Sequence, residues 1–193
     1  MRSVKRYLVA VVLLILSVSC EEDYLPKPKG YNRIDLPDHR FEPLLGSFPY
    51  TLEKSQLATF VPDTSRYSEP GWGNIRYELF DAEINLTYKK IKDKQSLKDY
   101  MEDSYKLTSK HQVRAYAIEE RALMTPQGYT GVVSELEGQV PTQFQFYLTD
   151  STENFIRGAL YFNTAMKNDS LAPVIEYIKV DMAHLMNTLK WKE

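Results

Sequence analysis

Residues 142–163 read TQFQFYLTDSTENFIRGALYFN. Two runs rich in aromatic and aliphatic residues, 142–149 and 154–163, flank a polar turn at Asp150–Thr152. Apolar runs of this length that are bounded by turn residues are typical of β-strands. Parallel neighbours need a crossover of about a dozen residues or more, so the short turn predicts an antiparallel hairpin.

The sequence before this hairpin has the same character. Strand-like runs occupy roughly residues 112–123 and 129–137, and turn signals follow them at Pro126–Gly128 and Gly138–Pro141. Apolar and polar residues alternate over residues 82–89, which is the period of a half-buried strand. Together these runs predict an antiparallel β-sheet built as a meander.

Two segments have helical periodicity instead. Residues 96–110 place an apolar stripe on one face, and Ser96 is expected to be the N-cap of that helix. Near the C-terminus a second stripe is expected to be capped by Asp169 or Ser170, with Pro173 tolerated in the first turn. Its members are Leu171, Val174, Ile175, Ile178, Met182, Leu185 and Leu189. We therefore predict an α+β sandwich, an antiparallel meander covered by amphipathic helices, and its layout resembles the Mog1/PsbP-like fold.

The N-terminus has the pattern of an export signal. Basic residues between Arg2 and Arg6 precede the apolar run Leu8–Leu16, which spans about 14 Å as a helix and is too short to cross a bilayer. The small residues before Cys20 resemble the lipobox of bacterial lipoproteins, although Ser17 stands where leucine is usual. The resemblance implies that residues 1–19 are a lipoprotein signal peptide and that Cys20 is lipidated. The alternative is an ordinary cleaved signal followed by a free thiol.

Proline distribution divides the rest of the chain. Seven of the ten prolines lie between Pro26 and Pro70, and proline removes amide donors and fixes the backbone. We predict a lipidated cysteine with a Pro-rich tether over residues 20–46 and a single α+β domain over 47–193. Some apolar tether residues, such as Tyr31 and Phe41, suggest that the tether also lies along an edge of the domain.

Composition excludes several classes of function. Without residues 1–19 the chain has 21 basic and 26 acidic residues, so its charge favours no binding to nucleic acid. A lone cysteine permits neither an intramolecular disulfide nor a multi-thiolate metal site. The sequence also lacks an HExxH pattern, a glycine-rich phosphate loop and a GxSxG elbow. We therefore predict no metal, no cofactor and no catalytic residue.

The three histidines and two polar residues of the hairpin turn, Asp150 and Ser151, are residue types that serve in catalysis. Ser151, His111 and either Asp103 or Asp150 are the residue types of a hydrolytic triad, but nothing in their spacing requires one. Asp150 and Ser151 fit better as turn residues whose side chains bind local backbone amides. His111 and His184 are expected to have structural roles at a helix end and a helix border, and His39 lies in the tether.

Two residues are candidate partner contacts. Trp72 lies in a glycine-rich segment, where a large ring is either a recognition group or a plug that closes one end of the sheet. Arg157 interrupts an apolar strand, so it faces solvent, pairs with Asp150 or Glu153, or engages a partner. The adjacent Gly158 marks either a bulge or a close backbone approach.

Taken together, several segments resemble the gliding-motility lipoprotein D family of Bacteroidota. The densest resemblance runs from Gln143 to Phe162. The other segments that carry it are Gly30–Pro37, Ile84–Lys89, Asp103–Ser104, Lys110–His111, Ala117–Glu120, Asp169–Leu171, Pro173–Val174 and Lys190–Lys192.

That resemblance implies a non-catalytic envelope lipoprotein needed for gliding motility or for type IX protein secretion. Its expected partners are other envelope proteins of those systems, and its lipid would hold it on the inner or outer membrane, facing the periplasm. Two alternatives follow from the residues. One is a lipoprotein that binds a glycan or lipid fragment in a pocket with aromatic walls, and the other is an envelope hydrolase.

Overall fold

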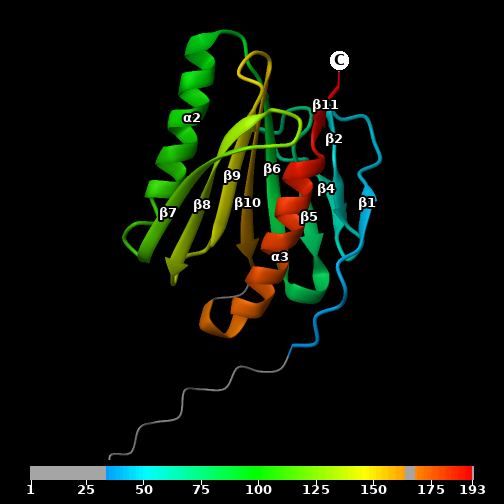
Figure 1. Ribbon diagram of the computed structural model, residues 1–193, viewed down its shortest axis with the longest axis vertical. Helices are drawn as coiled ribbons and strands as arrows, with labels where there is room; N and C mark the ends of the chain where they lie inside the picture. The colour runs from blue at the N-terminus through cyan, green and yellow to red at the C-terminus, as the bar shows by residue number, and fades with distance from the viewer. Residues whose placement is uncertain (1–33, 164–167, 193) are drawn as a thin grey trace, which may run out of the picture. The chain divides into compact units, whose positions relative to one another are not determined.

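The computed structural model describes residues 34–163 and 168–192, with the backbone alone at 168–170 (Figure 1). The predicted signal peptide, Cys20 and the first part of the predicted tether lie outside these residues. The side chains of Asp169 and Ser170, the predicted caps of the last helix, are also outside the described set.

A seven-stranded sheet forms the centre of the fold, and every neighbouring pair of strands in it is antiparallel. Its spatial order is β4 (Thr59–Pro62), β5 (Gly73–Tyr77), β6 (Ala82–Lys90), β10 (Asn154–Phe162), β9 (Phe144–Thr149), β8 (Thr130–Gly138) and β7 (Ala115–Met124). A short 3₁₀ helix, η1 (Glu78–Phe80), connects β5 to β6.

The connection after β6 determines the topology. Helix α2 (Lys94–Ser109) carries the chain from β6 to the far edge of the sheet, and β7 to β10 then return as a meander until β10 pairs with β6. The predicted meander and the α+β class are confirmed. The predicted strand at 112–123 begins three residues later, at Ala115, because backbone turns continue from the end of α2 through residues 110–114.

Strand β10 lies between β6 and β9, so its side chains face both layers of the molecule. Ile156 and Leu160 point to one face and are fully buried, whereas Arg157 points to the other. Gly158 causes no register shift, which rules out the expected bulge. A Cβ there would lie 2.3 Å from Cε1 of Phe146, so the close approach is made by a ring rather than by a backbone.

The main core lies between the sheet and helix α3 (Asn168–Thr188). Ile178, Met182 and Leu185 of the predicted stripe are buried against the apolar face of the sheet. The sheet residues of this face include Ile75, Ile84, Leu86, Phe146, Leu148, Ile156 and Leu160. Burying side chains of this size contributes about 1.5–3 kcal/mol each.

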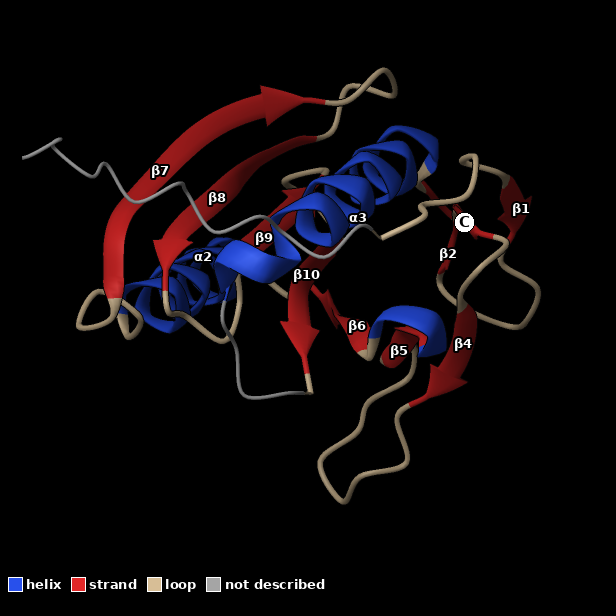
Figure 2. Ribbon diagram, turned by 90° about the horizontal axis from the view of Figure 1, so that it is seen from below, coloured by secondary structure: helices blue, strands red, loops and turns tan. Residues whose placement is uncertain are grey.

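Helix α2 covers the opposite face, as Figure 2 shows. Its Tyr100 ring packs 5.6 Å from that of Phe155, a neighbour of Arg157 in β10. The predicted N-cap was wrong: Asp93 is the cap, and it accepts a hydrogen bond from the Ser96 amide at 2.7 Å. The Ser96 hydroxyl in turn accepts a hydrogen bond from the Asp93 amide. The two reciprocal hydrogen bonds form a capping box, in which the side chain three residues after the cap binds the amide of the cap.

Residues 34–55, which we call the N-terminal strap, pack against the domain. In the strap, β1 (Phe41–Pro43) pairs with β3 (Glu53–Ser55), and β2 (Tyr50–Thr51) pairs with the C-terminal β11 (Lys190–Trp191). His39 Nδ1 lies 2.7 Å from the buried Asp181 carboxylate on α3, and the Phe41 ring stacks on His184 at 3.6 Å. Residues 34–46, assigned to the tether from their prolines, therefore make packed contacts with α3 and β3.

Candidate functional site

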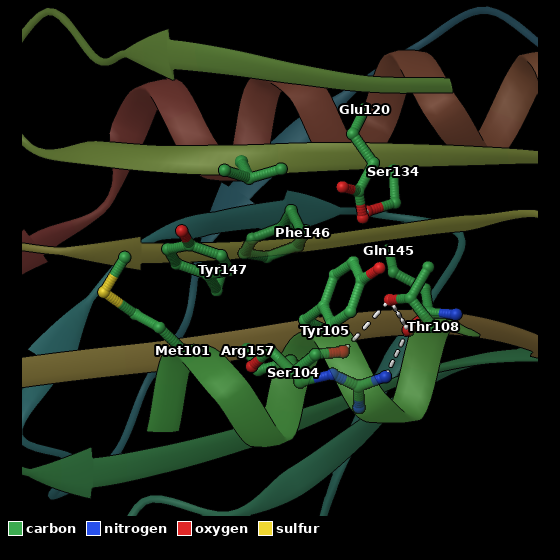
Figure 3. A pocket seen from close by; sticks show the side chains of 11 residues that line it. Met101, Ser104, Tyr105, Thr108, Glu120, Ser134, Gln145, Phe146, Tyr147 and Arg157 are labelled. Atoms are coloured by element: carbon green, nitrogen blue, oxygen red, sulfur yellow. Dashed lines mark hydrogen bonds between the residues drawn. The ribbon is translucent and has the colours of Figure 1, made fainter. Parts of the chain in front are cut away.

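A cavity of about 240 Å³ lies between α2 and the face of the sheet that α3 does not cover. Helix α2 contributes Met101, Tyr105 and Thr108 to its wall, and the strands contribute Glu120, Ser134, Gln145, Tyr147 and Arg157 (Figure 3). The residues of one strand alternate between the two faces, which explains why polar side chains collect here while their neighbours fill the apolar core.

A polar cluster lines one side of this cavity. Arg157 Nη2 donates to Oε1 of Gln145, and the Thr108 hydroxyl also donates to that oxygen at 3.4 Å. These two contacts orient the amide of Gln145, whose residue is only 2% exposed. Within the part of the chain that the structure describes, nothing accepts a hydrogen bond from Gln145 Nε2. The cluster therefore has more donors than acceptors.

Arg157 is partly buried, and no carboxylate in the part of the chain that the structure describes forms an ion pair with it. Burial lowers the pKa of its guanidinium below the ordinary value, and the Tyr161 phenol opposes that change. Arginine remains charged in proteins, so the positive charge persists in the cavity wall. Asp150 and Glu153, its two candidate ion-pair partners, are engaged elsewhere: Asp150 with the turn, and Glu153 with Lys90 at 3.7 Å.

Glu120 lies in another part of the cavity wall, on β7. Its carboxylate accepts a hydrogen bond of 3.1 Å from the Ser134 hydroxyl. Burial and the charge of Glu120 raise the pKa of the Tyr147 phenol, so Tyr147 is protonated at neutral pH. The cavity thus combines one cation and one anion with a methionine and two tyrosine rings.

The pKa of His111 depends on the charge of Arg157. Burial, and then the positive charge of Arg157, lower the pKa of the His111 imidazole. We expect Arg157→Gln to raise that pKa, because one of its two causes is removed, and Arg157→Lys to raise it less. An NMR titration of the three histidine rings would measure it, with Arg76→Gln on β5 as the control. An unchanged His111 pKa in Arg157→Gln would show that the two groups do not interact.

The structure does not bring the residues of the proposed triad together. Ser151 lies in the β9–β10 turn, near the start of α2, whereas His111 follows the end of that 16-residue helix, about 24 Å further along its axis. Asp150 accepts from three backbone amides of its own turn, each at 2.9 Å. Asp103 is 70% exposed beside Lys106. Among residues 34–163 and 168–192, no group of three potential metal ligands is found.

Trp72 is half-buried against the core at the β5 end of the sheet. Its indole Nε1 donates to the backbone oxygen of Tyr88 at 2.7 Å, and the Lys89 ammonium lies 4.7 Å from the ring centroid. Both contacts hold the ring against β6, which is the geometry expected of a plug. Arg157, the other predicted contact residue, lies in the cavity rather than on an open surface.

A second feature, which we call the α2–β7 corner, was not predicted from sequence. Residues 113–116, which are the end of the α2–β7 connection and the first two residues of β7, line a shallow depression of about 310 Å³ together with Gln139. Val113 is 94% exposed and Tyr116 is 81% exposed. The run at 112–123 is predicted as a strand without an assignment of its exposure, and the structure shows that β7 is an edge strand with most of its residues exposed. The cluster of charges at Glu119–Arg121 in that run is the sequence feature that indicates an exposed edge strand.

Comparison with protein families gives a match over residues 21–191, to the family described as gliding motility lipoprotein GldD. The chain belongs to this family. The match includes all the described residues except Lys192 and begins at the residue after Cys20. Membership in the GldD family confirms the resemblance noted in the sequence, and the family's description is that of a lipoprotein of gliding motility.

Among solved structures, this GldD-family chain is similar to cyanobacterial PsbP (CyanoP) from Synechocystis sp. PCC 6803. The two chains share 10% sequence identity, the similarity covers 83% of this chain and 98% of that one, and the TM-score is 0.48. Comparison with curated proteins found no match. None of the helices that the structure describes is long and apolar enough to cross a membrane.

Proposed function

We infer that this protein is an envelope lipoprotein, anchored through Cys20, that supports gliding motility and type IX protein secretion by binding another envelope protein rather than by catalysis. The observation that carries this proposal is the family match over residues 21–191, because it includes almost all of the chain after the predicted anchor. Multiple acyl chains on one cysteine provide durable attachment without a membrane-spanning helix.

The α2–β7 corner is the surface that best fits a protein partner. Tyrosine and arginine are among the residue types that dominate binding energy at protein interfaces, and the corner presents Tyr116 and Arg114 beside the exposed Val113. It also adjoins β7, the edge strand of the sheet in the described chain, which an extended segment of a partner could join as a further strand.

Complementation of a deletion strain tests the anchored role. Wild-type protein is expected to restore both surface spreading and the release of exported proteins, and Cys20→Ala is expected to restore neither. A deletion strain that spreads and secretes normally would contradict the motility and secretion role. Full rescue by Cys20→Ala would show that attachment to the membrane is not required.

A paired substitution tests the corner. We expect Val113→Asp with Tyr116→Asp to reduce spreading to the level of the deletion strain, because two charges would be buried in the contact. Exposed positions tolerate substitution within about 0.5 kcal/mol, so the free energy of unfolding should be unchanged. The matched control is Tyr67→Asp with Leu79→Asp, two side chains that are 78% and 69% exposed elsewhere. Normal spreading by the corner variant would place the partner contact on another surface.

A further inference from the structure

We propose that the cavity between α2 and the sheet binds a small monocarboxylic acid, with its carboxylate on the Arg157 guanidinium and its apolar body between α2 and β9. This site is separate from the α2–β7 corner and does not depend on the proposed role in motility. The argument rests on the unbalanced charge, the excess of donors, the apolar walls and the position of Glu120.

The unbalanced charge is the first step. A guanidinium has five N–H donors, and the side chains that accept hydrogen bonds from Arg157 in the described chain are Gln145, through its amide oxygen, and Tyr161, through its phenol. Neither group is a carboxylate. Keeping a charge away from water without a counter-ion is unfavourable, so an anion that enters the cavity gains the attraction that the protein itself leaves unused.

The donor excess selects the type of anion. A carboxylate offers two coplanar oxygens, which match the parallel N–H groups of a guanidinium, and such paired contacts are stronger than those between neutral groups. Gln145 Nε2, the buried donor without an acceptor, belongs to the same cluster and adds positive potential beside Arg157.

The remaining walls determine the body and the total charge of the ligand. Met101, Val132 and the rings of Tyr105 and Tyr147 offer apolar contact. Glu120 lies in the same cavity and would repel a second negative charge, which disfavours phosphate and dicarboxylates. A volume of about 240 Å³ is below the range of about 300–1,000 Å³ that is usual for larger ligands, so the ligand is small.

Isothermal titration calorimetry on the full-length protein in detergent tests the site with three probes: butyrate, butanol and inorganic phosphate. We expect butyrate to bind more tightly than either of the others. Butanol has the same carbon chain without the charge, so equal binding of the two would overturn the role of the carboxylate. Tighter binding of phosphate would overturn the assignment of a monocarboxylate.

Three variants locate the site. Arg157→Gln is expected to weaken butyrate binding about tenfold to a hundredfold, which is the usual effect of losing a hydrogen bond to a charged group. Glu120→Gln is expected to strengthen butyrate binding, because the substitution removes the opposing charge but keeps an oxygen that accepts from Ser134. This variant tests the proposal even if Arg157→Gln folds poorly. Arg76→Gln makes the same chemical change outside the cavity and should bind as the wild type does. Wild-type affinity in folded Arg157→Gln, or no gain in Glu120→Gln, would refute the site.

Discussion

Ile178→Ala is expected to lower the free energy of unfolding by about 2–5 kcal/mol. Ile178 is 0% exposed at the centre of α3, where it packs against the apolar face of the sheet. The truncation removes apolar contact and leaves a cavity that close-packed neighbours fill only in part. Urea unfolding of the full-length protein, followed by circular dichroism, would measure the change.

The control for this prediction lies two residues away on the same helix. Val180 is 51% exposed, so Val180→Ala should change the free energy of unfolding by no more than about 0.5 kcal/mol. Equal losses in the two variants would mean that α3 does not bury the face that the structure assigns to the core.

Gly131→Ala is expected to lower the free energy of unfolding by about 3 kcal/mol, which is the upper end of the usual range for overpacking. A Cβ at Gly131 would lie 1.9 Å from the backbone oxygen of Tyr147, on the neighbouring strand β9. A backbone oxygen cannot rotate away as a side chain does, so β8 and β9 must separate locally. Thermal and urea unfolding would both detect the loss.

Gly128→Ala separates this steric effect from backbone strain. Gly128 has a φ of +85°, but a Cβ there would meet no atom within 4 Å. The substitution should therefore lower the free energy of unfolding by only about 1 kcal/mol, which is the cost of placing alanine in the left-handed conformation. A loss at Gly128 as large as that at Gly131 would show that conformation rather than the contact with β9 determines both effects.

Local patterns predicted the elements whose burial repeats regularly along the chain. The alternation in β6 and the stripe of α3 have a period that reflects which face is covered, whereas β9 and β10 are buried on both faces and were predicted as continuous apolar runs bounded by a turn. Strands β1 to β3 have only two or three residues each, and their partners lie elsewhere in the chain. Such short segments contain too few residues to show a period, so tertiary contacts define them.

The partners of buried polar residues were also less predictable, because they depend on tertiary contacts rather than on local patterns. Asp181 lies beside Met182 in the apolar stripe of α3 and is 2% exposed. Its partners are His39, 142 positions away, and Tyr77, 104 positions away, so no local pattern identifies them. The period of β10 places Arg157 and Ile156 on opposite faces of the sheet. Only the crossover through α2 determines that a helix covers the face with Arg157 and that a cavity forms there.

The N-terminal strap has a mechanical consequence. A pulling force that enters the chain ahead of Ile34 reaches the three-residue pairing of β1 with β3 and the contacts of His39 and Phe41 with α3 before it reaches the seven-stranded sheet. These few bonds can release one after another, whereas β6 and β10 share nine paired positions. Under tension the strap would peel first, lengthening the link to the domain while the cavity and the α2–β7 corner keep their shape.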